Sequence, residues 1–293
     1  TLWARRERVA QEINSHGTNR QYVPENVRAA PLFGARRERV AQETNAHGTN
    51  RQYVPEGVRA APLFGGGVSA VSATSVLAEA LRGCTVIVIA VPSAFLGALL
   101  ARVRACGERR VFDLSGAAVV NLVKSLHYAE EEATLTTVSD DIERALPGVP
   151  VTSLMGPNIF REMVQPGEFA EATVGFRPRD AAAAARVQRL FSSTPNFHVS
   201  LCDDRTGVEL CGGLKNVVSL AAGFCEGLGL GGNAKAAAIR AGLLEMARLP
   251  AALGIASANE DTVLREACGV GDLILTCTVG RGRRLAAAFV EEG

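Results

Sequence analysis

The sequence has almost no net charge, no pair of cysteines spaced as CxxC, and no apolar run of about 18 residues. A net charge of +1 gives no reason to expect nucleic acid or membrane partners. Without a longer apolar run, no transmembrane helix is predicted. The seven cysteines lie mostly in apolar runs, which indicates reduced, buried thiols and no metal site. We therefore expect a cytoplasmic protein, with organellar targeting left open because the chain begins at Thr1 without methionine.

The chain has 293 residues, of which 47% are hydrophobic and 21% charged, so it can bury a core and is long enough for two domains. Residues 4–34 return at 35–65 with three changes. Two near-identical copies indicate a duplication and not a solenoid, which needs at least about three repeats. Which copy packs natively is left open.

Apolar runs alternate with helical patterns, which predicts an α/β fold with a parallel, doubly wound, Rossmann-like sheet. The β-branched run at 84–91 is typical of a strand buried on both faces. The predicted strands are 84–91, 119–123, 149–155, 169–176 and 197–202, and the predicted helices are 74–81, 93–105, 140–146 and 181–191.

The pattern from residue 203 onward is helical. We expect Asp180 and Asn233 to cap helices, a hydroxyl to cap the helix at 74–81, and Pro250 to end a helix at Leu249. The predicted domains are a dinucleotide-binding domain at 1–202, containing the duplication, and a mostly helical substrate domain at 203–293.

Sheets of this kind bind ligands beyond the carboxyl ends of their strands. Phe95, Lys124 and Asn158 follow three predicted strands, so we expect them to converge on one crevice. The alternatives are a core phenylalanine, a solvated lysine at a strand end and a helix-capping asparagine.

Residues 207–246 begin as a helix whose apolar stripe is interrupted by Lys215. The stripe comprises Leu210, Leu214, Val217, Val218, Ala221 and Cys225. The neighbours of Lys215 at helical spacing are apolar, and burial would lower its pKa and suit it to proton transfer. Gly212 and Gly213 let another element or a ligand approach the backbone closely. The alternative is a lysine whose stem runs along the core edge with its head in water.

Asp272 and Arg281 each stand beside glycines, where backbone can approach a ligand. The planar fork of an arginine suits a phosphate because it donates two parallel hydrogen bonds. The alternative is a charge that stabilises a helix terminus.

Three runs resemble the NAD-dependent glycerol-3-phosphate dehydrogenases. They are GVELCGGLKNVVSLAAGFCEGLGLGGNAKAAAIRAGLLEM at 207–246, SLMGPNI at 153–159, and CGVGDLILTC at 268–277 leading to Gly280 and Arg281. The resemblance implies a Rossmann-like domain followed by a helical substrate domain. It also implies a homodimer that interconverts sn-glycerol 3-phosphate and dihydroxyacetone phosphate with NAD(H).

The resemblance assigns roles to individual residues. Lys215 is the general acid/base, and Lys124 and Asp272 complete the catalytic set. The substrate-binding residues are Lys124, Asn216, Thr276 and Arg281, and the cofactor-binding residues are Phe95, Lys124, Phe160 and Arg281.

The chain departs from the family pattern in several places. It has no Gly-x-Gly-x-x-Gly turn, and the three glycines at 65–67 are expected to form a flexible turn and not a phosphate loop. Gly282 stands where the family has asparagine, and the helical domain stops short at Gly293. These departures leave two alternatives: a non-catalytic fragment or pseudoenzyme, or a related dehydrogenase acting on another phosphorylated or nucleotide-sugar alcohol. The arginines at 5, 6, 36 and 37 leave NADP open beside NAD.

Overall fold

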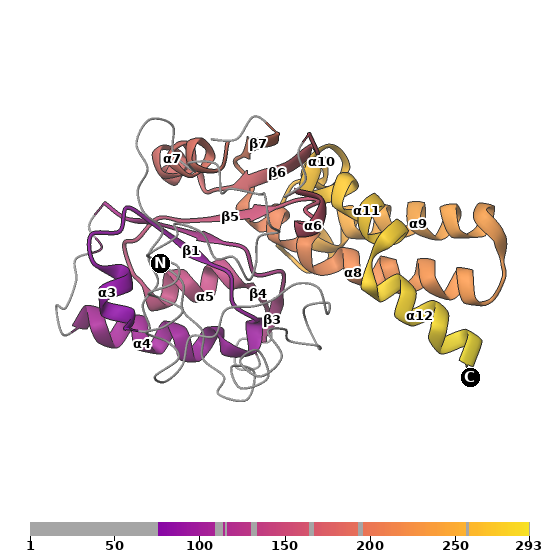
Figure 1. Cartoon of the computed structure of the whole chain (residues 1–293), viewed down its shortest axis with the longest axis horizontal. Coiled ribbons are helices and arrows are strands. Elements are labelled where there is room, and N and C mark those ends of the chain that lie inside the picture. The colour runs from indigo at the N-terminus through magenta and orange to yellow at the C-terminus, as the bar shows by residue number, and fades with distance from the viewer. Residues whose placement is uncertain are drawn as a thin grey trace. The chain divides into compact units, whose positions relative to one another are not determined.

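A computed structural model of the chain describes residues 76–108, 114, 116–129, 134–163, 167–192, 196–255 and 258–292 (Figure 1). The duplicated segment and the glycines at 65–67 lie outside the described residues. The chain divides into two compact units, one of Thr1–Cys84, Val103–Leu114 and Val164–Pro166, and one of Thr85–Arg102, Ser115–Met163 and Gly167–Gly293. The first unit contains helix α3 (Leu77–Leu81), which begins after Val76 with no side-chain cap, so the hydroxyl cap predicted for this helix is wrong.

The second unit is built around a five-stranded sheet in the order β1-β2-β5-β6-β7. The strands are β1 (Val86–Ile89), β2 (Ala118–Asn121), β5 (Val151–Met155), β6 (Ala170–Gly175) and β7 (Phe197–Cys202). Strands β1, β2 and β5 are mutually parallel, so their carboxyl ends lie at one edge of the sheet. β5 and β6 pair antiparallel, with Leu154 opposite Val174, whereas β6 and β7 are parallel. The α/β fold is confirmed, and the all-parallel sheet is corrected to a mixed one.

The remaining predicted elements occur in the order predicted, and the β3–β4 hairpin, α6 and η2 are additions. The first-half elements are the 3-10 turn η1 (Ser93–Phe95) and α4 (Leu96–Glu108), the hairpin strands β3 (Leu126–Ala129) and β4 (Thr134–Thr137), α5 (Val138–Ala145), α6 (Phe160–Met163), the 3-10 turn η2 (Pro178–Asp180) and α7 (Ala181–Phe191). The β3–β4 hairpin was not predicted, because Leu126–Ala129 has neither the length nor the alternation that marks a strand.

The prediction that the first strand is buried on both faces is wrong. β1 lies at the edge of the described sheet, and the side chain of Val88 is 46% exposed. β2 and β5 occupy interior positions, and all of their residues are buried. A continuous β-branched run therefore reports strand propensity here, and not the depth of the strand.

The helical part consists of α8 (Arg205–Gly227), α9 (Gly231–Ala252), α10 (Glu260–Arg265), the π-helical turn η3 (Ala267–Gly271), α11 (Asp272–Val279) and α12 (Arg281–Glu292). In Figure 1, α8 runs from the sheet into the orange and yellow helices. It packs on β5 and β6 and also contacts α9, α11 and α12. One core cluster accordingly joins Met155 of β5 to Val208, Cys211 and Val218 of α8.

Helix α8 is the one described helix long and apolar enough to cross a membrane by length and composition. More than half of its most apolar window is buried inside the protein. It also carries Arg205, Glu209 and Lys215, all of them buried. These features are typical of a core helix. The predicted apolar stripe is partly wrong, because the side chain of Val217 is 66% exposed.

Three predicted helix signals differ from the structure. Pro250 lies inside α9, which continues to Ala252, so the prediction that the helix ends at Leu249 is wrong. The missing N–H of Pro250 removes one backbone hydrogen bond from the last turn. Asn233 lies within the first turn of α9, and the N-cap is Leu230. Asp180 does occupy the N-cap of α7, but its side chain makes no capping hydrogen bond.

Candidate active site

The carboxylate of Asp272 joins two lysine side chains in the second unit. Lys215 Nζ donates to Asp272 Oδ1 at 2.5 Å, and Lys124 Nζ donates to Asp272 Oδ2 at 2.7 Å. The side chains of Lys215 and Asp272 are 8% and 2% exposed, whereas that of Lys124 is 32% exposed. One ammonium group is thus enclosed by the protein, and the other faces solvent.

Three different elements bring this cluster together. Lys124 lies in the irregular segment that follows β2, and its Nζ also donates to Gly156 O at 3.1 Å, just beyond β5. Lys215 is in the middle of α8, and Asp272 is the first residue of α11, directly after the π-helical turn. The cluster therefore lies at the carboxyl ends of parallel strands β2 and β5, the edge at which such sheets bind ligands.

The pKa of Lys215 is lowered from 10.5 to about 8, chiefly by burial and next by the nearby charge of Lys124, while Asp272 acts in the opposite direction. Its helical neighbours Val208, Cys211, Val218 and Ala222 are all buried, as predicted. A pKa near 8 leaves both protonation states accessible near neutral pH, which a proton-transfer group requires. The lowered pKa predicted from sequence is confirmed.

Thr276 lies one helical turn after Asp272 in α11. Its hydroxyl accepts a hydrogen bond from Lys215 Nζ at 2.9 Å and donates to the backbone carbonyl of Asp272 at 2.6 Å. Lys215 therefore has two oxygen partners, both from α11. This pairing fixes the direction of the ammonium group within an otherwise apolar surrounding.

Gly212 and Gly213 allow the Lys124 segment to lie directly on α8. A Cβ at Gly212 would meet Met155 Sδ at 3.0 Å and Lys124 Cγ at 3.4 Å. A Cβ at Gly213 would meet Leu126 Cγ at 2.8 Å. The predicted close approach of another element is confirmed, and that element carries Lys124.

Asn216 and Arg281 are both exposed, and they lie where α8 and α12 pack together. Ser219 Oγ donates to the backbone carbonyl of Asn216 at 2.8 Å. A Cβ at Gly282 would come within 2.7 Å of that same Ser219 Oγ. The family's asparagine at this position would therefore require Ser219 to move, which gives a local reason for glycine after Arg281.

The other predicted site residues have different surroundings. Phe95 ends η1, beyond the carboxyl end of β1 and hence at the same sheet edge as Lys124. Asn158 Nδ2 donates to Glu171 O of β6 at 2.8 Å, so its amide ties the segment that follows β5 to β6. Phe160 begins α6, and its side chain lies outside the described residues.

Sequence reasoning missed a buried polar cluster beneath the lysines. Glu209 of α8 accepts hydrogen bonds from Ser153 Oγ at 2.6 Å, Ser139 N at 3.1 Å and Asn121 Nδ2 at 3.2 Å. Burial raises the pKa of Glu209, and the hydrogen bonds from Ser139 and Ser153 act against that rise. A glutamate within the apolar run of α8 was the available signal, because a buried carboxylate requires partners.

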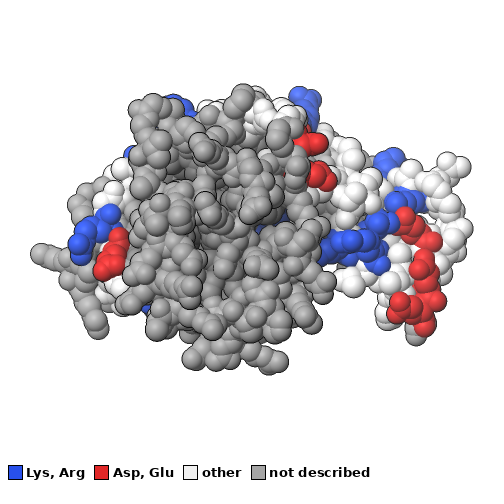
Figure 2. All heavy atoms as spheres, in the orientation of Figure 1, with Lys and Arg blue, Asp and Glu red and all other residues white. Residues whose placement is uncertain are grey.

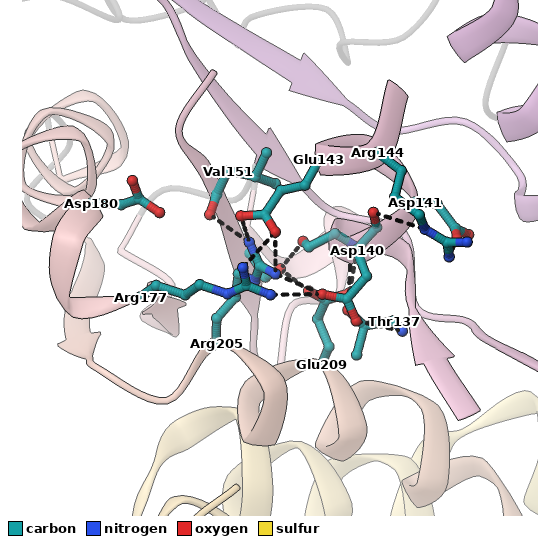
Figure 3. A network of polar contacts seen from close by, with 12 residues as sticks. Thr137, Asp140, Asp141, Glu143, Arg144, Val151, Arg177, Asp180, Arg205 and Glu209 are labelled. Atoms are coloured by element: carbon teal, nitrogen blue, oxygen red, sulfur yellow. Dashed lines mark hydrogen bonds and ion pairs between the residues drawn. The ribbon is translucent and has the colours of Figure 1, made fainter. Parts of the chain in front are cut away.

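A second polar network connects the start of α8 to α5 (Figure 3). Arg205, only 1% exposed, donates to Glu143 Oε1 and Asp140 Oδ1, each at 2.8 Å. Arg177 adds ion pairs to the same two acidic residues, at 2.7 and 3.0 Å. Figure 3 shows these arginines and carboxylates converging above α8. The network fixes the amino end of α8 against the sheet side of the unit.

Among the described residues, no group of three His, Cys, Asp or Glu side chains is arranged to hold a metal ion. All seven cysteines are free; Cys211, Cys268 and Cys277 are buried, and the others are half-buried. Figure 2 shows basic and acidic side chains next to each other on the helical part of the second unit, so its visible surface does not carry a single sign of charge.

Comparison with solved structures places the fold. A glycerol-3-phosphate dehydrogenase structure from Saccharomyces cerevisiae has a TM-score of 0.73 and 29% identity, covering 87% of this chain and 68% of that one. A structure from Dunaliella salina gives the same TM-score and identity over 97% of this chain and 45% of that one. The mixed sheet, the helical part and the lysine–carboxylate cluster at the strand ends define a protein of the Rossmann-type dehydrogenase class.

Family comparison is more specific. The model for the NAD-dependent glycerol-3-phosphate dehydrogenase N-terminus matches residues 31–182, and the model for the C-terminus matches 204–293. The chain therefore belongs to the NAD-dependent glycerol-3-phosphate dehydrogenase family. A cytoplasmic NAD(+) enzyme of Rattus norvegicus is 37% identical over 215 residues, which is 73% of this chain and 58% of that protein. An enzyme of Cuphea lanceolata is 40% identical over 219 residues, which is 74% of this chain and 55% of that protein.

Proposed function

We propose that this protein interconverts sn-glycerol 3-phosphate and dihydroxyacetone phosphate with NAD(H). The observation that carries the proposal is the buried Lys215, whose Nζ is held by Asp272 and Thr276 at the strand edge where the substrate is expected. Membership of the family, whose named relatives use NAD(+), supports the choice of reaction and cofactor. The chain spans less than two thirds of the length of those relatives.

Lys215 is the proposed general acid/base. In reduction, its ammonium gives a proton to the substrate oxygen that becomes the hydroxyl; in oxidation, the neutral amine takes that proton back. Lys124, with its more exposed ammonium, stabilises the charge that develops on the same oxygen. Asp272 orients both lysines. When bound, the dinucleotide supplies or takes up the hydride.

The remaining proposed roles concern binding. Asn216, Thr276 and Arg281 hold the substrate, and the guanidinium of Arg281 binds its phosphate. Phe95, Phe160, Lys124 and Arg281 contact the dinucleotide. The described residues fit the reacting end of such a site, because Lys124 and Phe95 follow neighbouring parallel strands at one sheet edge. The arginines proposed to admit NADP lie outside the described residues.

The domain boundary near residue 202, a homodimer and a cytoplasmic location are also proposed. The boundary coincides with the change from β7 to α8. Relatives named as cytoplasmic support the location. Exposed apolar side chains on α8 and α12, among them Val217, Leu285 and Phe289, support contact with a second copy. Light scattering on the purified protein measures the oligomeric state.

The reaction is tested by following NADH oxidation with dihydroxyacetone phosphate, with NADPH in parallel. We expect turnover with NADH and a lower rate with NADPH. Turnover with a nucleotide sugar or 6-phosphogluconate but not with dihydroxyacetone phosphate would assign another dehydrogenase reaction. Calorimetric titration with NADH separates an inactive enzyme that still binds cofactor from a non-catalytic fragment that does not.

A further inference from the structure

The segment that carries Lys124 is irregular between β2 and β3, yet it is held in one shape by Asn121. The side-chain oxygen of Asn121 accepts a hydrogen bond from Val123 N at 2.8 Å. An asparagine that bonds the backbone two residues ahead replaces a turn hydrogen bond and fixes the direction of the chain. Lys124 is the next residue, so its stem starts from a backbone that Asn121 sets.

Glu209 determines which way the Asn121 amide faces. Asn121 Nδ2 donates to Glu209 Oε2 at 3.2 Å, and both side chains are buried. With the amide reversed, its oxygen would face a carboxylate and its NH2 group would face the N–H of Val123. The donor–donor contact at Val123 is repulsive whatever the charge of Glu209, and the reversed amide would also lose its hydrogen bond to Glu209 Oε2, so the observed orientation is favoured.

Glu209 is itself fixed, and it belongs to the helix that carries Lys215. Ser153 Oγ donates to its other oxygen, Oε1, and Ser139 N donates to the same oxygen as Asn121, Oε2. About one turn further along α8, the stem of Lys124 packs against Gly212, where an added Cβ would lie 3.4 Å from Lys124 Cγ. The Lys124 segment is therefore attached to α8 at two levels, by a polar contact and by close packing.

We propose that Asn121 and Glu209 are positioning residues that fix the Lys124 turn on α8, so that the ammonium of Lys124 meets the same Asp272 carboxylate as Lys215. Neither residue contacts the cluster directly, and both act through Lys124. The kinetic part of this inference rests on the proposed function, whereas the structural part does not.

The first test is the titration of Lys215 in the 293-residue chain, followed by NMR of isotopically labelled lysine. Lys215 is assigned by its loss in Lys215→Met. The charge of Lys124 lowers the pKa of Lys215, so displacement of Lys124 raises that pKa. We expect Asn121→Ala to raise it by the same amount as Lys124→Met. In the double variant the pKa of Lys215 should rise no further than in either single variant, because both changes remove the same effect of Lys124.

Glu209 gives a test in which a direct charge effect has the opposite sign. If the charge of Glu209 acted directly on Lys215, removing it would lower the pKa of Lys215. If Glu209 acts by holding Lys124 in place, removing it displaces Lys124 and raises that pKa. We expect Glu209→Ala to raise it and Glu209→Gln to leave it near 8, because the Gln oxygen can still accept from Asn121. Thr152→Val is the matched control: it removes a buried hydrogen bond to Val119 in the neighbouring strand without touching the Lys124 turn, so the pKa should not move.

Two outcomes overturn the inference. In the first, Lys124→Met raises the pKa of Lys215 but Asn121→Ala leaves that pKa unchanged. In the second, Asn121→Ala raises the pKa of Lys215 by the same amount whether residue 124 is lysine or methionine. If Asn121→Ala does not fold, Glu209→Ala and Glu209→Gln are compared instead, and an unchanged pKa of Lys215 in Glu209→Ala overturns the inference. In a preparation that turns over, Asn121→Ala should lower kcat/KM for dihydroxyacetone phosphate about 100-fold, the scale of a small misplacement, with the KM for NADH unchanged. Absence of turnover in the unsubstituted protein counts against the proposed function and leaves the titration result standing.

Discussion

Lys124 and Lys215 come from separate elements and donate to the two different oxygens of one carboxylate, that of Asp272. Buried Lys215 and the more exposed Lys124 thus share one acceptor group, the Asp272 carboxylate. Any change in the charge of one ammonium group alters the electrostatic environment of the other.

The two directions of the reaction should show opposite pH dependence near the pKa of Lys215, about 8. Reduction of dihydroxyacetone phosphate requires the ammonium form, so kcat/KM should be level below this pH and fall above it. Oxidation of glycerol 3-phosphate requires the neutral amine, so kcat/KM should rise with pH through the same value. Steady-state rates in both directions measure this. If kcat/KM changed with pH in the same direction for both reactions, Lys215 would not be the general acid/base.

Lys215→Met should lower turnover by about two to four orders of magnitude, the usual effect of losing a positioned acid or base. Methionine keeps a similar volume and helix propensity, so the helix should persist. Affinity for NADH, measured by titration, should stay close to that of the unsubstituted protein. Retention of more than about a tenth of the turnover would favour Lys124 as the proton-transfer group.

Arg281→Lys should weaken binding of the phosphorylated substrate by about tenfold, because lysine keeps the charge and loses the two parallel hydrogen bonds of the guanidinium. A non-phosphorylated analogue such as dihydroxyacetone should be affected little. The comparison of KM values for the two substrates is the measurement. If binding of both substrates weakened equally, Arg281 would not be the residue that binds the phosphate.

Arg205→Met should destabilise the fold by about 1 to 3 kcal/mol, since it leaves Asp140 and Glu143, both partly buried, with Arg177 but without their buried partner. Arg144→Met is the control, because the side chain of Arg144 is 55% exposed and its ion pair with Asp141 lies at the surface. Such a pair contributes about 0 to 1 kcal/mol. Denaturant unfolding of both variants gives the comparison. Similar losses would show that burial of Arg205 does not matter.

Sequence patterns predicted the order of the main strands and helices because each has a period that follows from its geometry. They did not predict that β6 runs antiparallel to β5, since strand direction depends on how the connections cross the sheet. The position of β1 at the edge of the described sheet was missed for a similar reason: a β-branched run looks the same in an edge strand and a central one.

The cluster itself was only partly predictable. Helical spacing gave the burial and the lowered pKa of Lys215, because its neighbours lie within one turn of the same helix. The contact of Lys124 with Asp272 joins residues far apart in the chain, and the resemblance to a family, not any local pattern, brought them together. Asn121 and Glu209 escaped notice because each looks ordinary in its own segment, and their meaning lies in the contact between them.

Helix α8 carries Arg205, Glu209 and Lys215, and each faces a different partner. Each residue added to an α-helix turns the following side chains by about 100°. A single inserted or deleted codon between Glu209 and Lys215 would therefore swing the lysine away from Asp272 even if every side chain were kept. The number of residues between these positions should resist change during evolution more strongly than the identity of the residues that fill it.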